Sequence, residues 1–405
     1  MTKTFHIFPV GRQPQSAGGI RLVARYERRG GETVADAGEL WYEFQEWPSG
    51  LDSADADPFL MVTLPMAMEE GRDLQIHGAV SRSLLANLIE FRDYWCNLAP
   101  LRYQRIEFSA TTIREDGQLV RLPGAVALFS GGVDAAFTYW RHTRKLAGTA
   151  TQEIKQGIFV DGFDRVSFLR RDSFLRAYER TRKILAAEPV PLISVRTNYR
   201  QVEAEPFASN HLHMIASSAA FLGSCLHLFK GVAGTGLYAS TFSYHEQDNL
   251  WRCGTNPVSD RFLSSAGSQI IHDGAAISRI EKTAVLAGWP AFLENARVCG
   301  KPRDDGMNCG QCEKCLRTIL AALVVSGKIP AAFPVVPTDI AGLVAKTKVN
   351  PSVRPHWQEM VAWARAHDID NQWVALIETK TKKPWKERRH EFKAILRKMA
   401  GAMFN

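Results

Sequence analysis

The feature that most constrains the fold of this chain is a short apolar run that leads directly into a glycine turn. Residues 125–129 read Ala-Val-Ala-Leu-Phe, and residues 130–135 read Ser-Gly-Gly-Val-Asp-Ala. Such a run is typical of a strand that is buried on both faces. Two adjacent glycines allow a tight turn, and the free N–H groups at the start of a following helix can bind an anion. The segment therefore predicts a strand, an anion-binding turn and a helix in succession.

The sequence around this turn alternates short apolar runs with helical stretches, which predicts an α/β fold with a doubly wound parallel sheet. The predicted strands cover residues 125–129, 156–160, 192–195, 231–233 and 269–271. The predicted helices start at the glycine turn, at about residue 166 and at about residue 211. Ligands bind such sheets beyond the carboxyl ends of the strands, and the glycine turn lies there.

Two flanking regions have different patterns. Apolar residues alternate with a period of two around residues 20–26, 40–44 and 60–64, which predicts half-buried strands. An amphipathic helix is predicted around residues 84–95, and a further strand is predicted near residues 105–108. The last part of the chain is predicted to be helical, and three prolines between residues 330 and 337 mark its start. We therefore expect an N-terminal α+β accessory module (1–122), a central α/β domain (123–328) that contains the glycine turn, and a basic helical extension (329–405).

The net charge of +8 is concentrated at the end of the chain. Residues 380–398 contain nine Lys or Arg and two Glu, so this tail carries +7 and the remainder about +1. Apolar residues recur in the tail at helical spacing, which favours a helix with one packed face and one solvated basic face. The alternative is a docking arm for an acidic partner such as RNA.

The start of the chain lacks a basic segment followed by an apolar run, and no stretch approaches 18 uncharged apolar residues. We therefore expect a cytoplasmic protein with no membrane partner. Seven cysteines in a chain of this kind favour metal or thiol chemistry over a disulfide framework.

Four of the seven cysteines form one motif with the spacing Cys299-x9-Cys309-x2-Cys312-x2-Cys315. Four thiolates at this spacing can complete a tetrahedral Zn2+ site, which would be structural because no coordination position stays open. An iron–sulfur cluster is the main alternative. The corresponding ferredoxin run would continue with Cys-Pro, whereas Ile319 stands at that position.

The Ser-Gly-Gly-Val-Asp turn resembles the pyrophosphate loop of the N-type ATP pyrophosphatases. Together with the Cys-Gly-x-Cys-x-x-Cys core of the cysteine motif, it resembles the 7-cyano-7-deazaguanine synthases within that superfamily. The resemblance covers about residues 126–320, roughly half of the chain. It implies an adenine nucleotide alpha hydrolase-like fold, with ATP, Mg2+ and Zn2+ as cofactors.

The resemblance also implies an activity. ATP would adenylate the carboxylate of a deazaguanine-type substrate with release of pyrophosphate. Ammonia or another amine would then displace AMP, giving an amide or a conjugate, and a second adenylation of the amide would allow its dehydration to a nitrile. The length of the flanking regions favours a different acceptor, which we expect to be a protein or a nucleotide such as RNA.

The residues that match the family motifs take roles by this resemblance. The ATP-binding residues would be Phe129, Ser130, Gly131, Gly132, Val133, Asp134, Ala135, Val160, Asp161 and Gly162. The catalytic residues would be Asp134, which would also bind Mg2+, and Lys282, whose alternative role is that of a solvated surface lysine. The acyl pocket would include Gly234, Thr235 and Gly236.

One departure from the family motif concerns Ala135, because the usual loop has serine at that position. A hydroxyl that would donate to phosphate is therefore missing, while the backbone N–H is kept. Two other functions stay open: a tRNA-modifying adenylating enzyme, and a catalytically inactive nucleotide-binding subunit of a larger complex. A homodimer stays among the expected assemblies.

Overall fold

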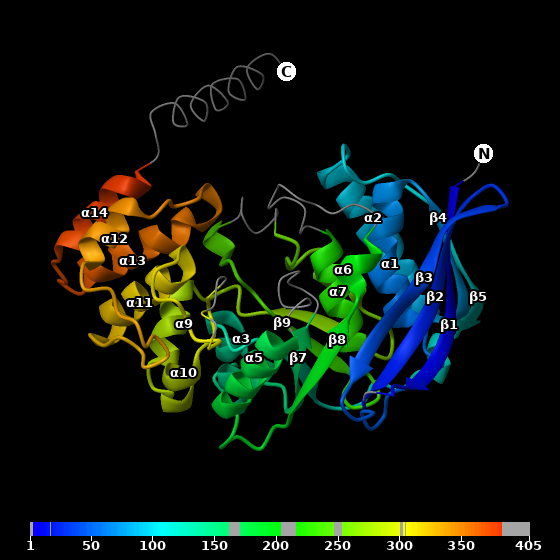
Figure 1. Cartoon of the computed structure of the whole chain (residues 1–405), viewed down its shortest axis with the longest axis horizontal. Helices are drawn as coiled ribbons and strands as arrows, with labels where there is room; N and C mark the ends of the chain where they lie inside the picture. Colours follow the sequence, from blue (N-terminus) through cyan, green and yellow to red (C-terminus); the bar gives the residue numbers. More distant parts are fainter. Residues whose placement is uncertain are drawn as a thin grey trace, which may run out of the picture.

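The computed structural model describes residues 3–16, 18–161, 171–203, 216–246, 253–299, 303 and 305–382. Its central element is one sheet of ten strands in the order β10-β9-β6-β7-β8-β3-β2-β1-β4-β5. Figure 1 shows the N-terminal strands β1 to β5 at the right of this sheet. Six of the nine neighbouring pairs are parallel. The chain therefore has the predicted α/β class, with a mixed sheet.

The bounds of the elements follow the chain. The strands are β1 (Lys3–Pro14), β2 (Ile20–Gly30), β3 (Thr33–Phe44), β4 (Asp73–Ser81), β5 (Phe108–Arg114), β6 (Ala125–Leu128), β7 (Ile154–Asp161), β8 (Leu192–Thr197), β9 (Thr235–Ala239) and β10 (Gln269–Asp273). The helices are α1 (Asp57–Glu70), α2 (Arg82–Leu98), α3 (Val133–Thr143), α5 (Arg171–Ile184), α6 (Tyr199–Val202), α7 (Ala216–His227), α9 (Arg279–Leu286), α10 (Pro290–Asn295), α11 (Glu313–Ser326), α12 (Ile340–Lys346), α13 (Arg354–Ala366) and α14 (Gln372–Thr381).

The parallel half of the sheet has a topological switch point at β6. The chain passes from β6 to β7 and β8 on one side, then returns to place β9 and β10 on the other side. The connections after β6 and β9 therefore diverge, and a crevice is expected between the carboxyl ends of these two strands. The glycine turn follows β6 at this place.

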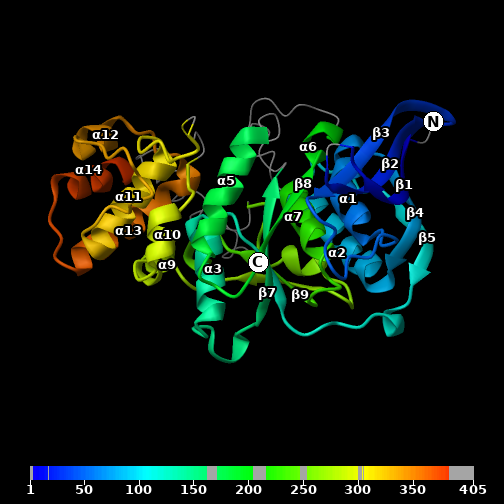
Figure 2. The same cartoon turned by 60° about the horizontal axis from the view of Figure 1, so that its bottom comes forward.

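Helices cover both faces of this half, because alternate residues of β6 enter different cores. Val126 packs in a core with residues of α1 and α7, whereas Ala125 and Ala127 pack with residues of α3 and α11. Figure 2 shows α3 and α5 together on one side of β7. This arrangement explains why the β6 sequence is apolar at every position.

The N-terminal region is continuous with the parallel half in both sheet and core. β3 pairs antiparallel with β8, with Tyr42 opposite Thr197. Phe5 and Leu40 of the N-terminal strands belong to the same core as Val126. The sheet and its core therefore continue across residue 122, where the sequence predicted a domain boundary.

Two predicted strands are wrong. Residues 60–64 lie in α1, where every residue from Asp57 to Met68 is buried. A helix that is buried on all sides carries no 3.6-residue periodicity, so its sequence can imitate a strand. Residues 231–233 form a turn after α7, and the strand begins two residues later as β9.

The helices after the cysteine motif form a separate cluster, at the left of Figure 1. Leu316 of α11 packs there with Trp357 of α13 and Val374 of α14. The basic tail predicted to be helical lies mostly outside the described residues, which end at residue 382. None of the helices in the described part of the chain has the length and apolar character that crossing a membrane requires.

The junction between β3 and β8 yields a stability prediction. Asn198 is 7% exposed; its Oδ1 accepts from the Trp41 N–H at 2.9 Å, and its Nδ2 donates to the Glu39 carbonyl at 2.7 Å. We expect Asn198→Ala to lower the free energy of unfolding by about 2–3 kcal/mol, because it removes the partners of two backbone groups. Urea denaturation measures this loss.

The matched control is Asn97→Ala, because the Asn97 side chain donates to the Asp93 carbonyl at an exposed position. Its effect should be within about 0.5 kcal/mol of wild type. Equal effects of the two substitutions would contradict the role assigned to Asn198.

Candidate functional site

The glycine turn between β6 and α3 has the geometry of an anion-binding loop. Gly131 has a φ of +77°, a conformation that favours glycine, and Gly132 is the N-cap of α3. The Gly131 carbonyl accepts a hydrogen bond from the Arg297 N–H at 2.8 Å. The turn therefore places the start of an eleven-residue helix at the carboxyl end of β6.

The predicted loop residues differ in what they can contribute. The side chains of Phe129, Val133 and Ala135 are buried, so only their backbone groups are available to a ligand. Ser130 is exposed, and Asp134 keeps 17% of its side chain exposed. The available side chains of the loop are therefore one hydroxyl and one carboxylate.

Asp134 lies between two cations of α9. Its Oδ2 is 2.6 Å from Arg279 Nη1, and its Oδ1 is 3.9 Å from Lys282 Nζ. Burial opposes ionisation of Asp134, but the positive charges of Arg279 and Lys282 outweigh it and hold the pKa of the carboxyl below its usual value. Asp134 is therefore a carboxylate at neutral pH.

Lys282 is a buried residue of this site, so its alternative as a solvated surface lysine is wrong. Its side chain is 1% exposed, and Nζ donates to the Ser240 carbonyl at 2.6 Å. Helix α9, which carries it, begins with a capping box formed by Ser278 and Glu281. Burial lowers the pKa of Lys282, and the nearby Asp134 carboxylate opposes this shift.

A chain of hydrogen bonds fixes the Ser240 segment that binds Lys282. Ser240 directly follows β9, and its Oγ is 2.8 Å from His272 Nε2. His272 Nδ1 is 2.8 Å from Asp260 Oδ2, and all three side chains are at most 3% exposed. No pattern in the sequence predicted this chain, although Ser240 lies at the carboxyl end of a strand, where ligands bind in sheets of this kind.

The C-terminal helices also reach this region. Arg317 Nη1 of α11 donates to His356 Nδ1 of α13 at 2.6 Å, and His356 Nε2 lies 3.1 Å from Glu246 Oε1. Because Arg317 can only donate, Nδ1 accepts and Nε2 carries the proton. Burial lowers the pKa of His356. None of these three residues was predicted from the sequence, because they lie in three distant segments.

The remaining predicted nucleotide-binding residues lie at the end of β7. Asp161 is 2% exposed, and its Oδ2 accepts from Arg196 Nε at 3.1 Å. Val160 is half-buried, and Gly162 lies outside the described residues. Because β7 is parallel to β6, Val160 and Asp161 share the edge of the sheet on which the glycine turn lies.

The residues predicted to line the acyl pocket lie at the opposite edge of the sheet. Thr235 and Gly236 begin β9, and Thr235 is level with Ala125, the first residue of β6. A Cβ on Gly234 would lie 2.6 Å from the Leu122 carbonyl oxygen, so close packing explains this glycine. The structure does not bring these residues together with the glycine turn, because the predicted fourth strand was placed too early.

The four cysteines of the predicted metal motif come together. Their sulfur atoms all lie within 4.8 Å of one another, with 3.7 Å between Cys299 and Cys312 and 3.8 Å between Cys309 and Cys315. Zn–S bonds of about 2.3 Å in a tetrahedron require sulfur atoms about 3.8 Å apart. The cluster can therefore hold a metal ion such as zinc.

The local backbone supports this cluster and joins it to the glycine turn. Gly310 has a φ of +73°, and Asn308 Oδ1 accepts from the N–H groups of Val298 and Cys299. Arg297, which binds the Gly131 carbonyl, precedes these residues directly. An ion in the cluster would thus stabilise the segment that contacts the turn.

The chain matches no protein-family model, no curated protein and no solved structure. Three features of its geometry define the chemistry of the site. These are the glycine turn at the switch point, the two cations around Asp134 and the four clustered thiols.

The Asp134 ion pair yields a prediction of pH dependence. We expect Arg279→Met to lower the free energy of unfolding by about 3 kcal/mol near neutral pH, because it leaves a largely buried carboxylate without its nearest cation. The pKa of Asp134 is lower in the folded state than in the unfolded state. The stabilisation is therefore complete above about pH 4 and is lost as the pH falls through the folded-state pKa.

Urea denaturation between about pH 7 and about pH 3 tests this prediction, since the difference between variant and wild type should shrink at acid pH. The control is Arg82→Met, because Arg82 and its partner Glu115 are both more than half exposed. Its effect should stay below about 1 kcal/mol. A difference for Arg279→Met that grows on acidification would contradict the assignment.

The cysteine cluster yields a prediction of metal content. We expect about one zinc ion per chain by mass spectrometry of the purified protein, and loss of that ion in Cys312→Ser with a lower thermal midpoint. Cys96→Ser is the control, because Cys96 lies outside the cluster. Iron in place of zinc, or an unchanged metal content in Cys312→Ser, would refute the zinc assignment.

Proposed function

We propose that this protein is an ATP-dependent adenylating enzyme of the ATP pyrophosphatase class, acting on the carboxylate of a deazaguanine-type substrate. One observation carries the proposal. The glycine turn lies at the switch point of the sheet, and two cations, the half-buried Arg279 and the buried Lys282, converge on its Asp134. Helix N–H groups, cations and a carboxylate are the groups that bind a metal–triphosphate.

The strand order supports the finer fold assignment. The strands β6 to β10 follow the classic order of doubly wound nucleotide-binding sheets, with β6 at the centre. We infer from this order and from the pyrophosphate-loop motif that the parallel half has the adenine nucleotide alpha hydrolase-like fold. The nucleotide would then lie across the carboxyl ends of β6, β7 and β9.

Each charged residue takes a role in this proposal. The Asp134 Oδ1 atom is buried and has no hydrogen-bond partner within the protein, which suits a ligand to Mg2+. Lys282 and Arg279 would neutralise phosphate charge in a region with little water. Mg2+ would supply charge neutralisation across the phosphate oxygens.

The proposed reaction has two balanced steps. A substrate carboxylate oxygen attacks the α-phosphorus of ATP, and the bond to the β-phosphate oxygen breaks to release pyrophosphate. An amine nitrogen then attacks the acyl carbon, the acyl–oxygen bond breaks, and AMP leaves. The protein contributes position and charge, and it needs no covalent nucleophile.

The acceptor is ammonia or another amine, whose nitrogen loses a proton to solvent, and the product of these two steps is an amide or a conjugate. A nitrile would require a second ATP, which adenylates the amide oxygen with release of pyrophosphate; AMP and the remaining N–H protons would then leave. Zinc in the cysteine cluster would be structural, because four thiolates leave no open coordination position. The bond between Arg297 and Gly131 connects that cluster with the phosphate loop. The same residues would bind nucleotide in a catalytically inactive subunit, so turnover decides between the two functions.

Turnover is measured as pyrophosphate release from ATP and Mg2+ with 7-carboxy-7-deazaguanine. We expect release by the wild type, and a loss of at least about 100-fold in kcat in Asp134→Asn and Lys282→Met, since each removes one charge from the phosphate site. Lys155→Met is the control, because Lys155 is paired with Glu153 at an exposed position. It should keep wild-type turnover.

Nucleotide binding by the same variants separates the alternatives. Absence of pyrophosphate release together with ATP binding that depends on Asp134 would favour an inactive subunit. ATP binding by Asp134→Asn that equals the wild type, without release in any sample, would refute the proposed site itself.

A further inference from the structure

Strand β5 forms one edge of the ten-stranded sheet, and this edge is open. It ends the strand order, and Figure 2 shows it at the right-hand end of the molecule. Within the described residues, the backbone of residues 109–113 has hydrogen bonds to β4 and to no other segment. The opposite edge is covered, because the Ile270 N–H of β10 donates to Ser264 Oγ at 3.0 Å. An open edge can pair with a strand of another chain.

The composition of β5 favours such pairing. The strand reads Phe-Ser-Ala-Thr-Thr-Ile-Arg, with neither the Lys nor the Pro residues that commonly protect open edges. Thr111, Thr112 and Ile113 are β-branched and exposed, and Ile113 keeps 41% of its surface. Residues of this kind pack well against a neighbouring strand. The edge therefore has the side chains of a paired strand but lacks the partner.

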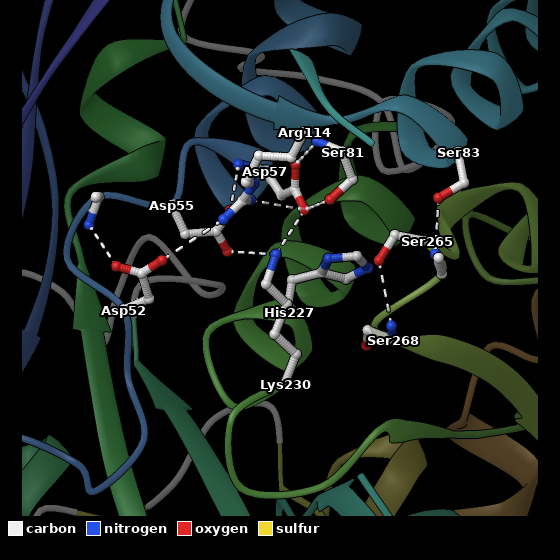
Figure 3. Close-up of polar contacts among 12 residues, drawn as sticks. Asp52, Asp55, Asp57, Ser81, Ser83, Arg114, His227, Lys230, Ser265 and Ser268 are labelled. Carbon is white, nitrogen blue, oxygen red and sulfur yellow. Dashed lines mark hydrogen bonds and ion pairs between the residues drawn. The ribbon is translucent and has the colours of Figure 1, made fainter. Parts of the chain in front are cut away.

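A buried network of charges holds the end of β5 in place (Figure 3). Arg114, the last residue of β5, binds Asp55 and lies 3.4 Å from Asp57 Oδ2. Lys230 Nζ is 2.6 Å from a carboxylate oxygen of each aspartate. The network connects β5 with the start of α1 and with the segment after α7. The edge is therefore ordered before a partner binds, which lowers the entropic cost of pairing.

Helix α2 adds an exposed apolar residue beside this edge. Arg82 of α2 is 2.5 Å from Glu115, which follows β5, and Asp93 of α2 is 3.3 Å from Arg105, which precedes β5. The helix therefore runs antiparallel to the strand. Ile89 shares a helix face with Arg82 and Asp93, so it lies level with the middle of β5. Ile89 is 45% exposed and adds apolar surface to the edge.

The pairing of β5 with β4 determines which of its backbone groups face outwards. The Leu74 N–H donates to the Glu107 carbonyl at 2.9 Å, and Leu74 pairs with Phe108. The N–H and C=O groups of Phe108 therefore point away from β4, and those of Ala110, two residues further on, do the same. An antiparallel strand that pairs with β5 must bond to these groups.

We propose that β5 is a self-association surface, on which two copies of this chain pair antiparallel about a two-fold axis at Ala110. Each copy extends the sheet of the other. Arg105 of one copy then lies opposite Glu115 of the other, so the charges at the two ends of the strands are complementary. Both α2 helices lie on the same face of the joined sheet, where the Ile89 side chains approach each other. This proposal does not depend on the proposed function.

The register places Ser109 of one copy opposite Thr111 of the other, and both residues are exposed. Sedimentation velocity of the full chain from about 1 to about 200 µM should show a shift from monomer to dimer, because a small interface gives weak affinity. Ser109→Lys combined with Thr111→Lys places like charges opposite each other at two positions. This variant should weaken dimerisation about tenfold or more.

Ser109→Glu combined with Thr111→Lys is the matched control, because the same two positions then carry opposite charges across the interface. It should dimerise at least as tightly as the wild type. Both variants should keep the wild-type circular dichroism, since the two positions are exposed. A wild type that stays monomeric at every concentration, undiminished dimerisation of the double-lysine variant, or equal weakening by both variants would overturn the proposal.

Discussion

The buried contact between Asp134 and the cations of α9 is the interaction on which the arrangement of the site depends. A carboxylate that loses most of its water is stable only if cations replace that water. Arg279 and Lys282 do so, and they are three residues apart on one helix, so both reach the same carboxylate. Helix α9, the first α-helix after β10, thus brings both cations to the glycine turn.

A third cation near the site, Arg317, also requires partners, and its contacts connect the C-terminal helices to the site. Arg317 donates to Glu313 and to His356. Trp357 Nε1 also donates to Glu313 Oε1 at 2.8 Å. The same helices share an apolar core with Ile280 of α9. Charge compensation and apolar packing thus act at one interface, and residues after the cysteine motif belong to the structure of the site.

The most accurate predictions of local structure came from motifs that lie within one short segment of the sequence. The strand, the glycine turn and the four cysteines each lie within one segment, and all were located correctly. Arg279 could have been found with Lys282, because residues three apart share a helix face. His356 and Glu246 could not, because their pairing depends on contacts between segments more than a hundred residues apart. Helix α1 was missed because burial on all sides removes the helical period.

Ala135 illustrates how stability and phosphate binding can have opposite requirements at one position. The residue is 7% exposed in the first turn of α3. A serine hydroxyl placed there would be largely buried, and in the absence of phosphate an unpaired one costs about 1–3 kcal/mol. Alanine avoids that cost and keeps the backbone N–H. Arg279 and Lys282 would then neutralise the phosphate charge in place of a serine hydroxyl. The Asp134 carboxylate already holds both cations in position in the structure.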